Sequence, residues 1–209
     1  MSFFNMEHIA FDISGYAVSY VELIATIFGL LSVYFASRAN ILTWSTGIVN
    51  EFFLFILFYQ VQLYPDMFLQ VYFFIVTLYG WYFWKRKTKD NKITQTSPKG
   101  KLLLLTIIAI GTLVSGLFFR DIHLLLPSYF EKPAAYPWTD SFIMVSSIVA
   151  TVLLARKKIE TWYLWIALDI VCVILYFKKD IYVLSIEYLV FLLLASSGLY
   201  HWRKGAKHG

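Results

Sequence analysis

Apolar segments of at least 17 residues recur seven times along the chain, and they constrain its fold more than any other feature. They lie at roughly residues 18–37, 41–60, 67–84, 102–119, 139–155, 160–177 and 181–202. Each is close to the length that a helix needs to cross about 30 Å of hydrocarbon. Because a backbone inside a bilayer must satisfy its own hydrogen bonds, the segments predict an all-α membrane protein with seven transmembrane helices.

The composition supports this class. Of the 209 residues, 59% are hydrophobic and 15% are charged, whereas a soluble domain has about 25% charged residues. Residues 1–17 contain no Lys or Arg, so they lack the basic region of a cleaved signal peptide, and we expect the first helix to be retained. The single cysteine, Cys172, lies inside the sixth segment, which excludes a disulfide framework and a cysteine-based metal site.

The basic residues predict the orientation. Seven of the 18 Lys and Arg residues lie in the linker at 85–101, which the positive-inside rule assigns to the cytoplasm. The same assignment places three other basic groups inside, namely Arg38, Arg156 to Lys158 and the tail at 203–209. Fourteen basic residues then lie inside and four outside, with Lys178 and Lys179 as a local exception. We expect a multi-pass protein of the bacterial cytoplasmic (inner) membrane with an extracytoplasmic segment at 1–17, and no nucleic-acid partner.

The sequence also contains an internal repeat. A shift of 118 residues aligns residues 38–86 with 156–204 without a gap. The matched pairs include rare residues and charges: Arg38 and Arg156, Ile41 and Ile159, Thr43 and Thr161, Trp44 and Trp162, Glu51 and Asp169, Tyr64 and Tyr182, Gly80 and Gly198, Trp84 and Trp202, Lys85 and Arg203. Because tryptophan, glycine and charges recur at one offset, the pattern indicates a duplication.

The duplicated unit contains three helices, at 18–84 and again at 139–202. Three crossings reverse the direction of the chain, so a fourth crossing is needed before the second unit can begin in the same orientation. Residues 102–119 supply it, and because they carry no charge we expect a lipid-facing connector helix. The sequence therefore predicts two parallel three-helix repeats in a 3+1+3 order, the arrangement of the SWEET transporters.

The strongest candidate site lies in the sixth segment. Trp162, Trp165 and Asp169 follow the i, i+3, i+7 spacing of one helical face, which places two indole rings beside a carboxylate. An acid in mid-span usually faces a partner, a ligand or water because an ionised carboxylate there is costly. This slot suits a flat, positively charged or amide-bearing molecule. The alternatives are an interfacial aromatic belt for the two tryptophans and a packing contact between helices for Asp169.

Further candidates lie at similar depths on neighbouring helices. Asn50 and Glu51 occupy the corresponding part of the second segment, and Trp44 is the repeat counterpart of Trp162. Gln70 offers donors and acceptors that match a carboxamide edge, or it forms a hydrogen bond between helices. The remaining candidates are one acid and two aromatic residues, Glu187, Tyr188 and Tyr79. Three acids without a base in the spans predict either a water-filled cavity or protonated carboxyl groups.

Nothing in the sequence indicates catalysis or a bound cofactor. The four histidines lie outside the span interiors without an i, i+4 partner, so we expect no metal site. No glycine-rich phosphate loop is present, which argues against ATP-driven transport by this chain alone. No cluster of Lys or Arg lies inside the spans, so we expect an unphosphorylated substrate. Asp140 opens the fifth segment, where we expect it to be a helix N-cap.

Several motifs together resemble the PnuC family of vitamin transporters. They are Trp-x-x-Trp-x-x-x-Asp at 162–169, Leu-Gln-Val-Tyr-Phe-Phe at 69–74, Tyr-Gly-Trp-Tyr at 79–82, Leu-Ala-Arg-Lys-Lys at 154–158 and the pair Glu187-Tyr188. The resemblance covers nearly the whole chain. It implies a 3+1+3 SWEET-like fold, a homotrimer, and nicotinamide riboside as the cargo, with thiamine or another vitamin in related branches. The family pattern often has Asn where this chain has Asp169, which leaves the two cargoes open.

The resemblance and the site together predict a carrier that moves an aromatic B vitamin by facilitated diffusion. A cytoplasmic vitamin kinase that phosphorylates the cargo after entry would maintain the gradient, so this kinase is the expected functional partner. Alternatives are a thiamine carrier of the same fold, a proton-coupled carrier that uses the intramembrane acids, and a membrane receptor that transports nothing.

Overall fold

The computed structural model describes residues 5, 8–13, 15–61, 64–86, 92–126, 133–178 and 182–207. Within these residues a hairpin of β1 (Ile9–Ile13) and β2 (Tyr16–Ser19) precedes the helices α1 (Tyr20–Ser37), α2 (Leu42–Gln60), α3 (Tyr64–Lys85), α4 (Pro98–Leu125), α5 (Pro137–Ala155), α6 (Glu160–Lys178) and α7 (Tyr182–Lys207). Seven helices of the described chain are long and apolar enough to cross a membrane. The prediction of an all-α protein with seven such helices is confirmed.

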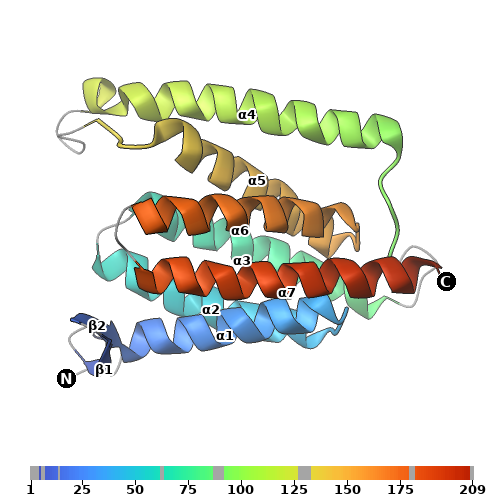
Figure 1. Cartoon of the computed structure of the whole chain (residues 1–209), viewed down its shortest axis with the longest axis horizontal. Coiled ribbons are helices and arrows are strands. Elements are labelled where there is room, and N and C mark those ends of the chain that lie inside the picture. The colour runs from blue at the N-terminus through green and yellow to red at the C-terminus, as the bar shows by residue number, and fades with distance from the viewer. Residues whose placement is uncertain are drawn as a thin grey trace.

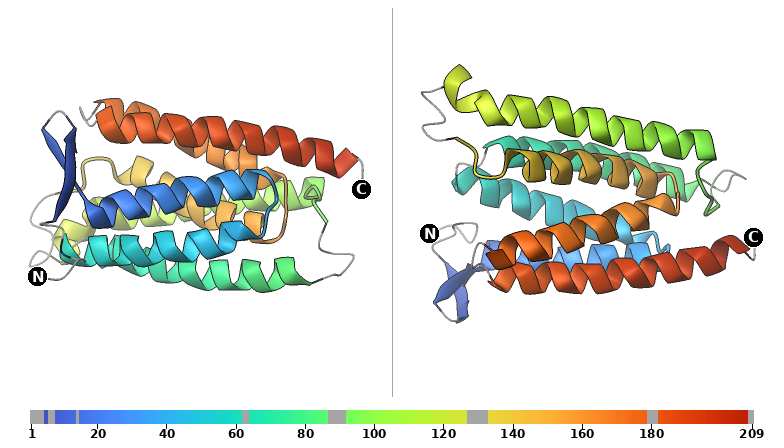
Figure 2. Two further views of the ribbon diagram at one scale, coloured as in Figure 1. Left: turned by 90° about the horizontal axis from the view of Figure 1, so that it is seen from below. Right: turned by 45° about the horizontal axis from the view of Figure 1, so that its top comes forward.

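The helices run back and forth along one axis, so the N-terminus and the C-terminus lie at opposite ends of the bundle (Figure 1). In each half the middle helix packs against its two neighbours, α2 against α1 and α3, and α6 against α5 and α7. Contacts of α1 with α7 and of α3 with α5 join the two halves. α4 packs on α5 at one side of the bundle (Figure 2).

The connector helix is longer than the sequence predicts. α4 begins at Pro98 instead of residue 102, because Ser97 caps its first turn by accepting a hydrogen bond from the Gly100 N–H at 3.2 Å. It continues to Leu125, so it also includes the polar residues after Phe119. Its outer face is apolar and exposed at Leu102, Leu103, Leu105, Ile110, Leu113 and Val114. An apolar exposed face on a membrane helix suits contact with lipid or with another subunit.

The helix ends of the two halves correspond at the offset of 118 residues. α2 begins at Leu42 and ends at Gln60, while α6 begins at Glu160 and ends at Lys178. The turns before them also match, because Ala39 and Lys157 both have a φ of 51°, a left-handed conformation that is uncommon outside glycine. The same backbone turn therefore links the first two helices of each half, as a duplication predicts.

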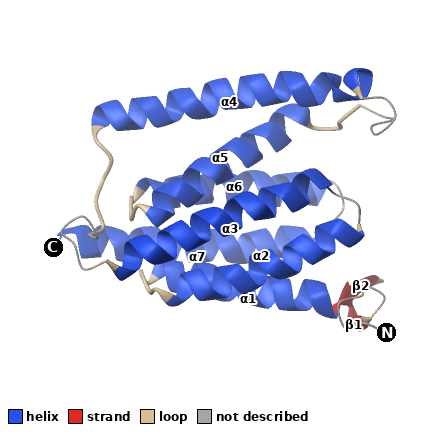
Figure 3. Ribbon diagram, turned by 180° about the vertical axis from the view of Figure 1, so that it is seen from behind, coloured by secondary structure: helices blue, strands red, loops and turns tan. Residues whose placement is uncertain are grey.

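The hairpin at the N-terminus is a feature that the sequence reasoning missed. Gly15 adopts a φ of 87°, and the Asp12 Oδ1 atom accepts a hydrogen bond from its N–H at 2.8 Å. Figure 3 shows the two strands beside the start of α1. The Tyr16 hydroxyl donates to the Glu22 Oε1 atom at 2.6 Å and so joins the hairpin to α1. Partial burial and this contact raise the pKa of Tyr16 to about 12.

The linker after α3 crosses to the second half of the protein. We call residues 92–97 the linker strap. The Thr94 N–H donates to the Lys157 carbonyl at 3.0 Å, and the Ile159 N–H donates to the Thr94 carbonyl at 3.1 Å. The Glu160 carboxylate accepts from the Thr96 N–H and hydroxyl, both at 3.0 Å, and pairs with Lys101 at 3.2 Å. The strap is therefore fixed to the turn between α5 and α6.

One helix boundary contradicts the sequence analysis. Tyr136 is the N-cap of α5, which begins at Pro137, and Asp140 lies inside the first turn. The expectation that Asp140 is the cap is therefore wrong. An acid in the first turn still interacts favourably with the positive end of the helix dipole.

Candidate functional site

A cavity of about 260 Å³ lies between the two halves of the bundle. Six helices contribute to its wall, and we call it the central cavity. Its lining residues are Gly29, Ser32, Val33, Ala36, Thr43, Trp44, Gly47, Glu51, Phe73, Thr77, Thr151, Leu154, Trp162, Trp165, Asp169, Tyr188, Phe191 and Ala195. The cavity combines aromatic rings, small residues and two carboxylates, and its lining includes no Lys or Arg.

Trp44 and Trp162 form matching walls of the central cavity. Each side chain is almost fully buried, with 2% and 1% of its surface exposed. Each indole lies against a glycine of the helix that follows in the sequence, Trp44 of α2 against Gly80 of α3 and Trp162 of α6 against Gly198 of α7. A Cβ atom on these glycines would lie 2.3 Å and 2.6 Å from the rings. The buried positions exclude the interfacial-belt alternative for Trp162.

Two further tryptophans close the bundle behind this pair. Trp84 packs edge-to-face on Trp44 with ring centroids 5.1 Å apart, and Trp202 packs in the same way on Trp162 at 5.5 Å. The Trp84 indole N–H donates to the Ala155 carbonyl at 3.1 Å, and that of Trp202 donates to the Ala36 carbonyl at 2.9 Å. Each hydrogen bond runs from one half of the protein to the other. We call Trp44, Trp84, Trp162 and Trp202 the tryptophan cluster.

Two acids face the central cavity from corresponding helices. Glu51 on α2 has 8% of its surface exposed, and Asp169 on α6 has 4%. The Thr77 hydroxyl donates to the Glu51 Oε1 atom at 2.5 Å, while Glu51 Oε2 has no hydrogen-bond partner among the described residues. Ala195 stands at the position that corresponds to Thr77, so Asp169 lacks this donor. The two carboxylates therefore differ in how far their oxygens are already satisfied.

The two halves present different surfaces beside these acids. Trp165 lines the cavity from α6, and the corresponding residue on α2 is Gly47. A Cβ atom on Gly47 would make ordinary contacts, the nearest with Ser32 Oγ at 3.4 Å and Thr77 Cγ2 at 3.6 Å, so a methyl group fits on this side. Tyr188 completes the wall from α7 and stacks on Tyr176 with ring centroids 5.4 Å apart. The α6 half thus presents a flat aromatic ring to the cavity where the α2 half presents a glycine without a side chain.

The structure brings six of the ten predicted site residues into the central cavity. They are Trp44, Glu51, Trp162, Trp165, Asp169 and Tyr188. Gln70 is buried on α3, but it lines a separate cavity of about 190 Å³ whose lining also includes Glu51. Gln70 is therefore separated from the central cavity by the helix face that bears Glu51.

Three predicted site residues contact other parts of the bundle. The Asn50 amide donates to the Ala25 carbonyl at 2.8 Å, which joins α2 to α1. Glu187 accepts a hydrogen bond from Thr26 on α1. Tyr79 is 37% exposed and lies beneath the Arg156 guanidinium, 5.4 Å from its ring centroid. These positions suit roles in holding helices together.

Sequence reasoning missed the small and aromatic residues of the cavity. Gly47, Thr77 and Phe191 line it without carrying charge or a recognisable motif, and Phe73 lies in the motif at 69–74 but was not singled out as a site residue. One signal was available, because Phe73 and Phe191 are separated by 118 residues and so occupy equivalent positions of the repeat. Thr77 is recognisable only from its contact with Glu51.

A bundle of seven membrane-length helices around a buried cavity between two three-helix halves is the architecture of a secondary transporter. The family model described as "Nicotinamide mononucleotide transporter" matches residues 19–204, and the chain belongs to this family. It is a multi-pass membrane transporter and not an enzyme.

Individual relatives cover nearly the whole chain. The Nicotinamide riboside transporter PnuC of Escherichia coli (strain K12) is 32% identical over 99% of this chain and 96% of its own length. The Riboflavin/roseoflavin transporter RibM of Streptomyces davaonensis is 28% identical over 97% of this chain and 92% of its own. The crystal structure of the Vitamin B3 transporter PnuC has a TM-score of 0.68 and 24% identity, covering 91% of this chain and 83% of that one. This last similarity supports the fold.

Proposed function

We propose that the protein carries nicotinamide riboside across the membrane through the central cavity. The observation that carries this proposal is a buried aromatic cavity with two carboxylates, Glu51 and Asp169, and no basic side chain in its lining. The pyridinium ring of the riboside is flat and positively charged. Aromatic faces attract such a cation, and a buried carboxylate nearby neutralises it.

The roles of the lining residues follow from their positions. Trp165 stacks on the ring, because it lines the cavity with a flat aromatic face where the other half has only Gly47. Asp169 neutralises the ring or accepts hydrogen bonds from the ribose hydroxyls. Trp44 and Trp162 complete the site, since the indole N–H of each is buried without a partner among the described residues. Tyr188 and Glu51 bound the remaining walls.

The four other predicted residues act around this site. Asn50 and Glu187 hold α2 and α7 against α1, and Tyr79 supports Arg156 at the end of α5. Gln70 lines the smaller cavity on the other side of Glu51. We propose that these residues position the walls of the central cavity instead of touching the ring.

The cargo enters without a phosphate group. The family description refers to a mononucleotide, but a phosphate carries about two negative charges at neutral pH. Two carboxylates would repel it, and the lining supplies no Lys or Arg to compensate. The volume of about 260 Å³ lies near the lower end of the usual range for small-molecule sites, which is about 300–1,000 Å³. Both properties favour the smaller, unphosphorylated riboside.

Transport proceeds by rocking of the two halves about the central cavity. The interface between the halves includes the hydrogen bonds of Trp84 and Trp202 to opposite halves, which must break when the cavity opens at that end. Facilitated diffusion is sufficient if a cytoplasmic kinase phosphorylates the riboside after entry, because the free form is then removed continuously. The kinase is the functional partner that we propose.

We propose that the C-terminus lies in the cytoplasm and the N-terminal hairpin outside, in the inner membrane of a bacterium. Fourteen of the 18 basic residues support this orientation. We also propose a homotrimer, as the family resemblance implies. The exposed apolar face of α4 offers surface for contact with lipid or a neighbouring subunit.

Riboflavin is a second candidate cargo because a relative named for riboflavin transport is 28% identical over nearly the whole chain. Thiamine remains a third, since its thiazolium ring is also flat and cationic. Riboflavin is larger and uncharged. The charge and volume of the central cavity therefore favour the riboside over riboflavin, while the choice between riboside and thiamine depends on direct binding.

Binding of the purified protein to nicotinamide riboside, its uncharged reduced form, thiamine and riboflavin tests the proposal. Trp165→Ala should lose about 0.5–2 kcal/mol through the cation–π interaction, before any loss of packing, and Trp165→Phe should lose less. Asp169→Asn should weaken binding of the charged riboside more than that of its reduced form. Thiamine or riboflavin binding far more tightly than the riboside would overturn the choice of cargo. Unchanged affinities in all three variants would remove Trp165 and Asp169 from the site.

Flux measurements in liposomes separate the mechanisms. A facilitated carrier should equilibrate the riboside with or without a pH gradient. Flux that stops when the gradient is dissipated would instead show a proton-coupled carrier. Tight binding without any flux would indicate a receptor.

A further inference from the structure

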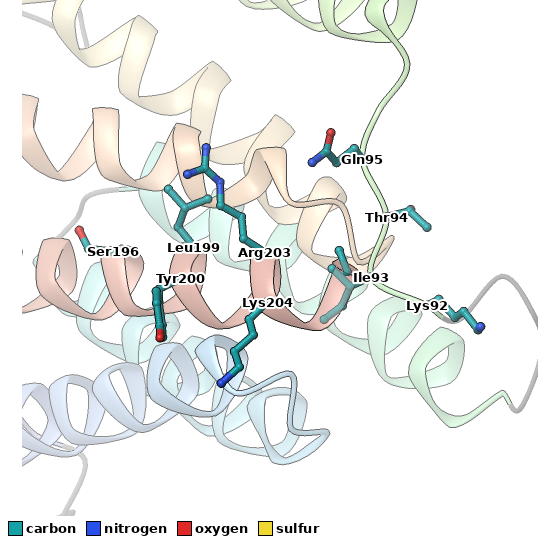
Figure 4. A pocket seen from close by; sticks show the side chains of 10 residues that line it. Lys92, Ile93, Thr94, Gln95, Ser196, Leu199, Tyr200, Arg203 and Lys204 are labelled. Atoms are coloured by element: carbon teal, nitrogen blue, oxygen red, sulfur yellow. The ribbon is translucent and has the colours of Figure 1, made fainter. Parts of the chain in front are cut away.

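A groove of about 870 Å³ lies outside the central cavity, where the linker strap passes over the C-terminal turns of α7 (Figure 4). We call it the basic groove. Its lining residues are Lys92, Ile93, Thr94, Gln95, Ser196, Leu199, Tyr200, Arg203, Lys204 and Ala206. The lining contains three basic residues and no acid.

The walls of the basic groove are fixed by the fold. On one side Thr94 pairs through its backbone with the turn between α5 and α6, and its hydroxyl accepts from the Lys158 ammonium at 2.8 Å. Ile93 packs against the tryptophan cluster, and its Cδ1 atom would lie 3.5 Å from a Cβ atom on Gly205. The other side is the regular helix α7. The groove is therefore a built feature of the bundle.

The basic side chains surround the groove from several directions. Figure 4 shows Arg203 on the same side of α7 as Gln95, while Lys204 and Tyr200 point the opposite way. The Arg203 guanidinium lies 5.3 Å from the ring centroid of Tyr163 and donates to its hydroxyl. Within the described chain Arg203 has no carboxylate partner. Its charge is thus oriented by a neutral ring and left uncompensated.

An exposed apolar stripe on α7 leads into the groove. Ile186, Leu189, Leu193 and Tyr200 are all exposed, and their spacings of three, four and seven residues place them on one helical face. Lys204 follows Tyr200 at the next i, i+4 position and points to the same side of α7, whereas Arg203 points to the other side (Figure 4). A cation at a membrane helix end beside an exposed tyrosine and a long apolar stripe matches a lipid, whose phosphate and chains lie in the same order.

We propose that the basic groove binds an anionic phospholipid. Its phosphate lies beside Lys204, where the stripe ends, and Arg203, Gln95 and Lys92 are the other donors of the groove. One acyl chain follows the stripe from Leu193 to Ile186. A soluble phosphate would use the charges but not the stripe, which is why we assign a lipid. The bound lipid would hold the linker strap against α7.

Native mass spectrometry of the full-length protein in detergent tests this assignment. Phosphatidylglycerol should bind, and zwitterionic phosphatidylcholine of the same chains should bind much more weakly. Each basic residue near an anionic lipid surface contributes about 1 kcal/mol. The double variant Arg203→Gln, Lys204→Gln should therefore lose about 25-fold in affinity for phosphatidylglycerol. Lys99→Gln is the matched control, because Lys99 is exposed at the same end of the bundle but lies outside the groove.

Two further variants keep the test independent of folding. Arg203→Lys retains the charge and should retain most of the binding, while Leu193→Ser should weaken phosphatidylglycerol without affecting binding of inorganic phosphate. Equal affinity of the double variant and Lys99→Gln for phosphatidylglycerol would overturn the proposal. The lipid assignment would also be overturned if millimolar inorganic phosphate displaced phosphatidylglycerol and Leu193→Ser left the affinity for phosphatidylglycerol unchanged. That result would indicate a soluble anion as the ligand. Dissociation of an oligomer by the double variant, with lipid binding intact, would show that a second copy covers the groove.

Discussion

Replacing Gly80 by alanine would test the packing that shapes the central cavity. The new Cβ atom would lie 2.3, 2.5 and 2.6 Å from three carbons of the Trp44 ring, well inside normal contact distance. Trp44 cannot turn away easily, because Trp84 packs edge-to-face against it at 5.1 Å. Overpacking of this kind costs about 1–3 kcal/mol, and alanine in a helix regains about 0.5–1 kcal/mol relative to glycine. We expect a net destabilisation of about 1–2 kcal/mol.

The assay is unfolding of the purified protein in mixed micelles, combined with riboside binding. Gly198→Ala should behave like Gly80→Ala, since its Cβ atom would lie 2.6 Å from Trp162. Gly47→Ala is the control within the same cavity, because no atom lies closer than 3.4 Å to its Cβ position. It should be neutral or slightly stabilising. Wild-type stability of Gly80→Ala, or a greater loss for Gly47→Ala, would refute the reasoning.

Three other perturbations address the surroundings of the site. Glu160→Gln should destabilise the protein by about 1.5–3 kcal/mol because the linker strap loses charge-assisted hydrogen bonds. Lys101→Gln should cost under about 1 kcal/mol because its ion pair with Glu160 is exposed at the lysine. Denaturant titration of the two variants compares these losses of stability. The pKa of Tyr16 of about 12 lies above that of a free tyrosine. The contact of Tyr16 with Glu22 therefore contributes fully to the stability of the fold below about pH 10, and this contribution is lost as the pH rises through 12. The ultraviolet difference between wild type and Tyr16→Phe should show an ionisation near pH 12, and an ionisation near pH 10 would contradict the contact. After Cys172 has been replaced, Lys99→Cys should resist impermeant thiol reagents in intact cells, while Leu126→Cys should react with them. The opposite labelling pattern would show that the proposed orientation in the membrane is inverted.

The number and order of the helices could be predicted because hydrophobic length and the 118-residue repeat are properties of the sequence itself. The N-terminal hairpin could not be predicted in the same way. Its strands are short, and most of its stabilising contacts are with one another and with α1, as at Tyr16 and Glu22. Two strands alone are marginal in water, so their formation depends on the neighbouring helix. The turn at Asp12 and Gly15 was the one local signal.

The site was only partly predictable because sequence gives the depth of a residue in the membrane more readily than the direction in which it points. Glu51 and Asn50 are adjacent in the sequence and lie at one depth, yet Glu51 faces the central cavity and Asn50 bonds to α1. α2 is apolar around most of its surface, so its periodicity does not identify the inner face. Trp162, Trp165 and Asp169 do line one cavity, and the sequence could bring them together because three unusual residues share one spacing.

The two halves of the bundle differ at particular positions of the central cavity, and these differences suit the asymmetric molecule that we propose as the cargo. The shared residues Trp44 and Trp162 give both halves the same wall, and each depends on a glycine at the equivalent position. The two halves differ at other positions of the cavity, where each half would contact a different part of the cargo. Gly47 has no side chain where the other half has the ring of Trp165, while Thr77 occupies one Glu51 oxygen and Ala195 leaves Asp169 without that donor. Restoring symmetry should therefore harm recognition more than folding. Gly47→Trp would add a second ring to the cavity lining, and Ala195→Thr would give Asp169 a donor that competes with the cargo.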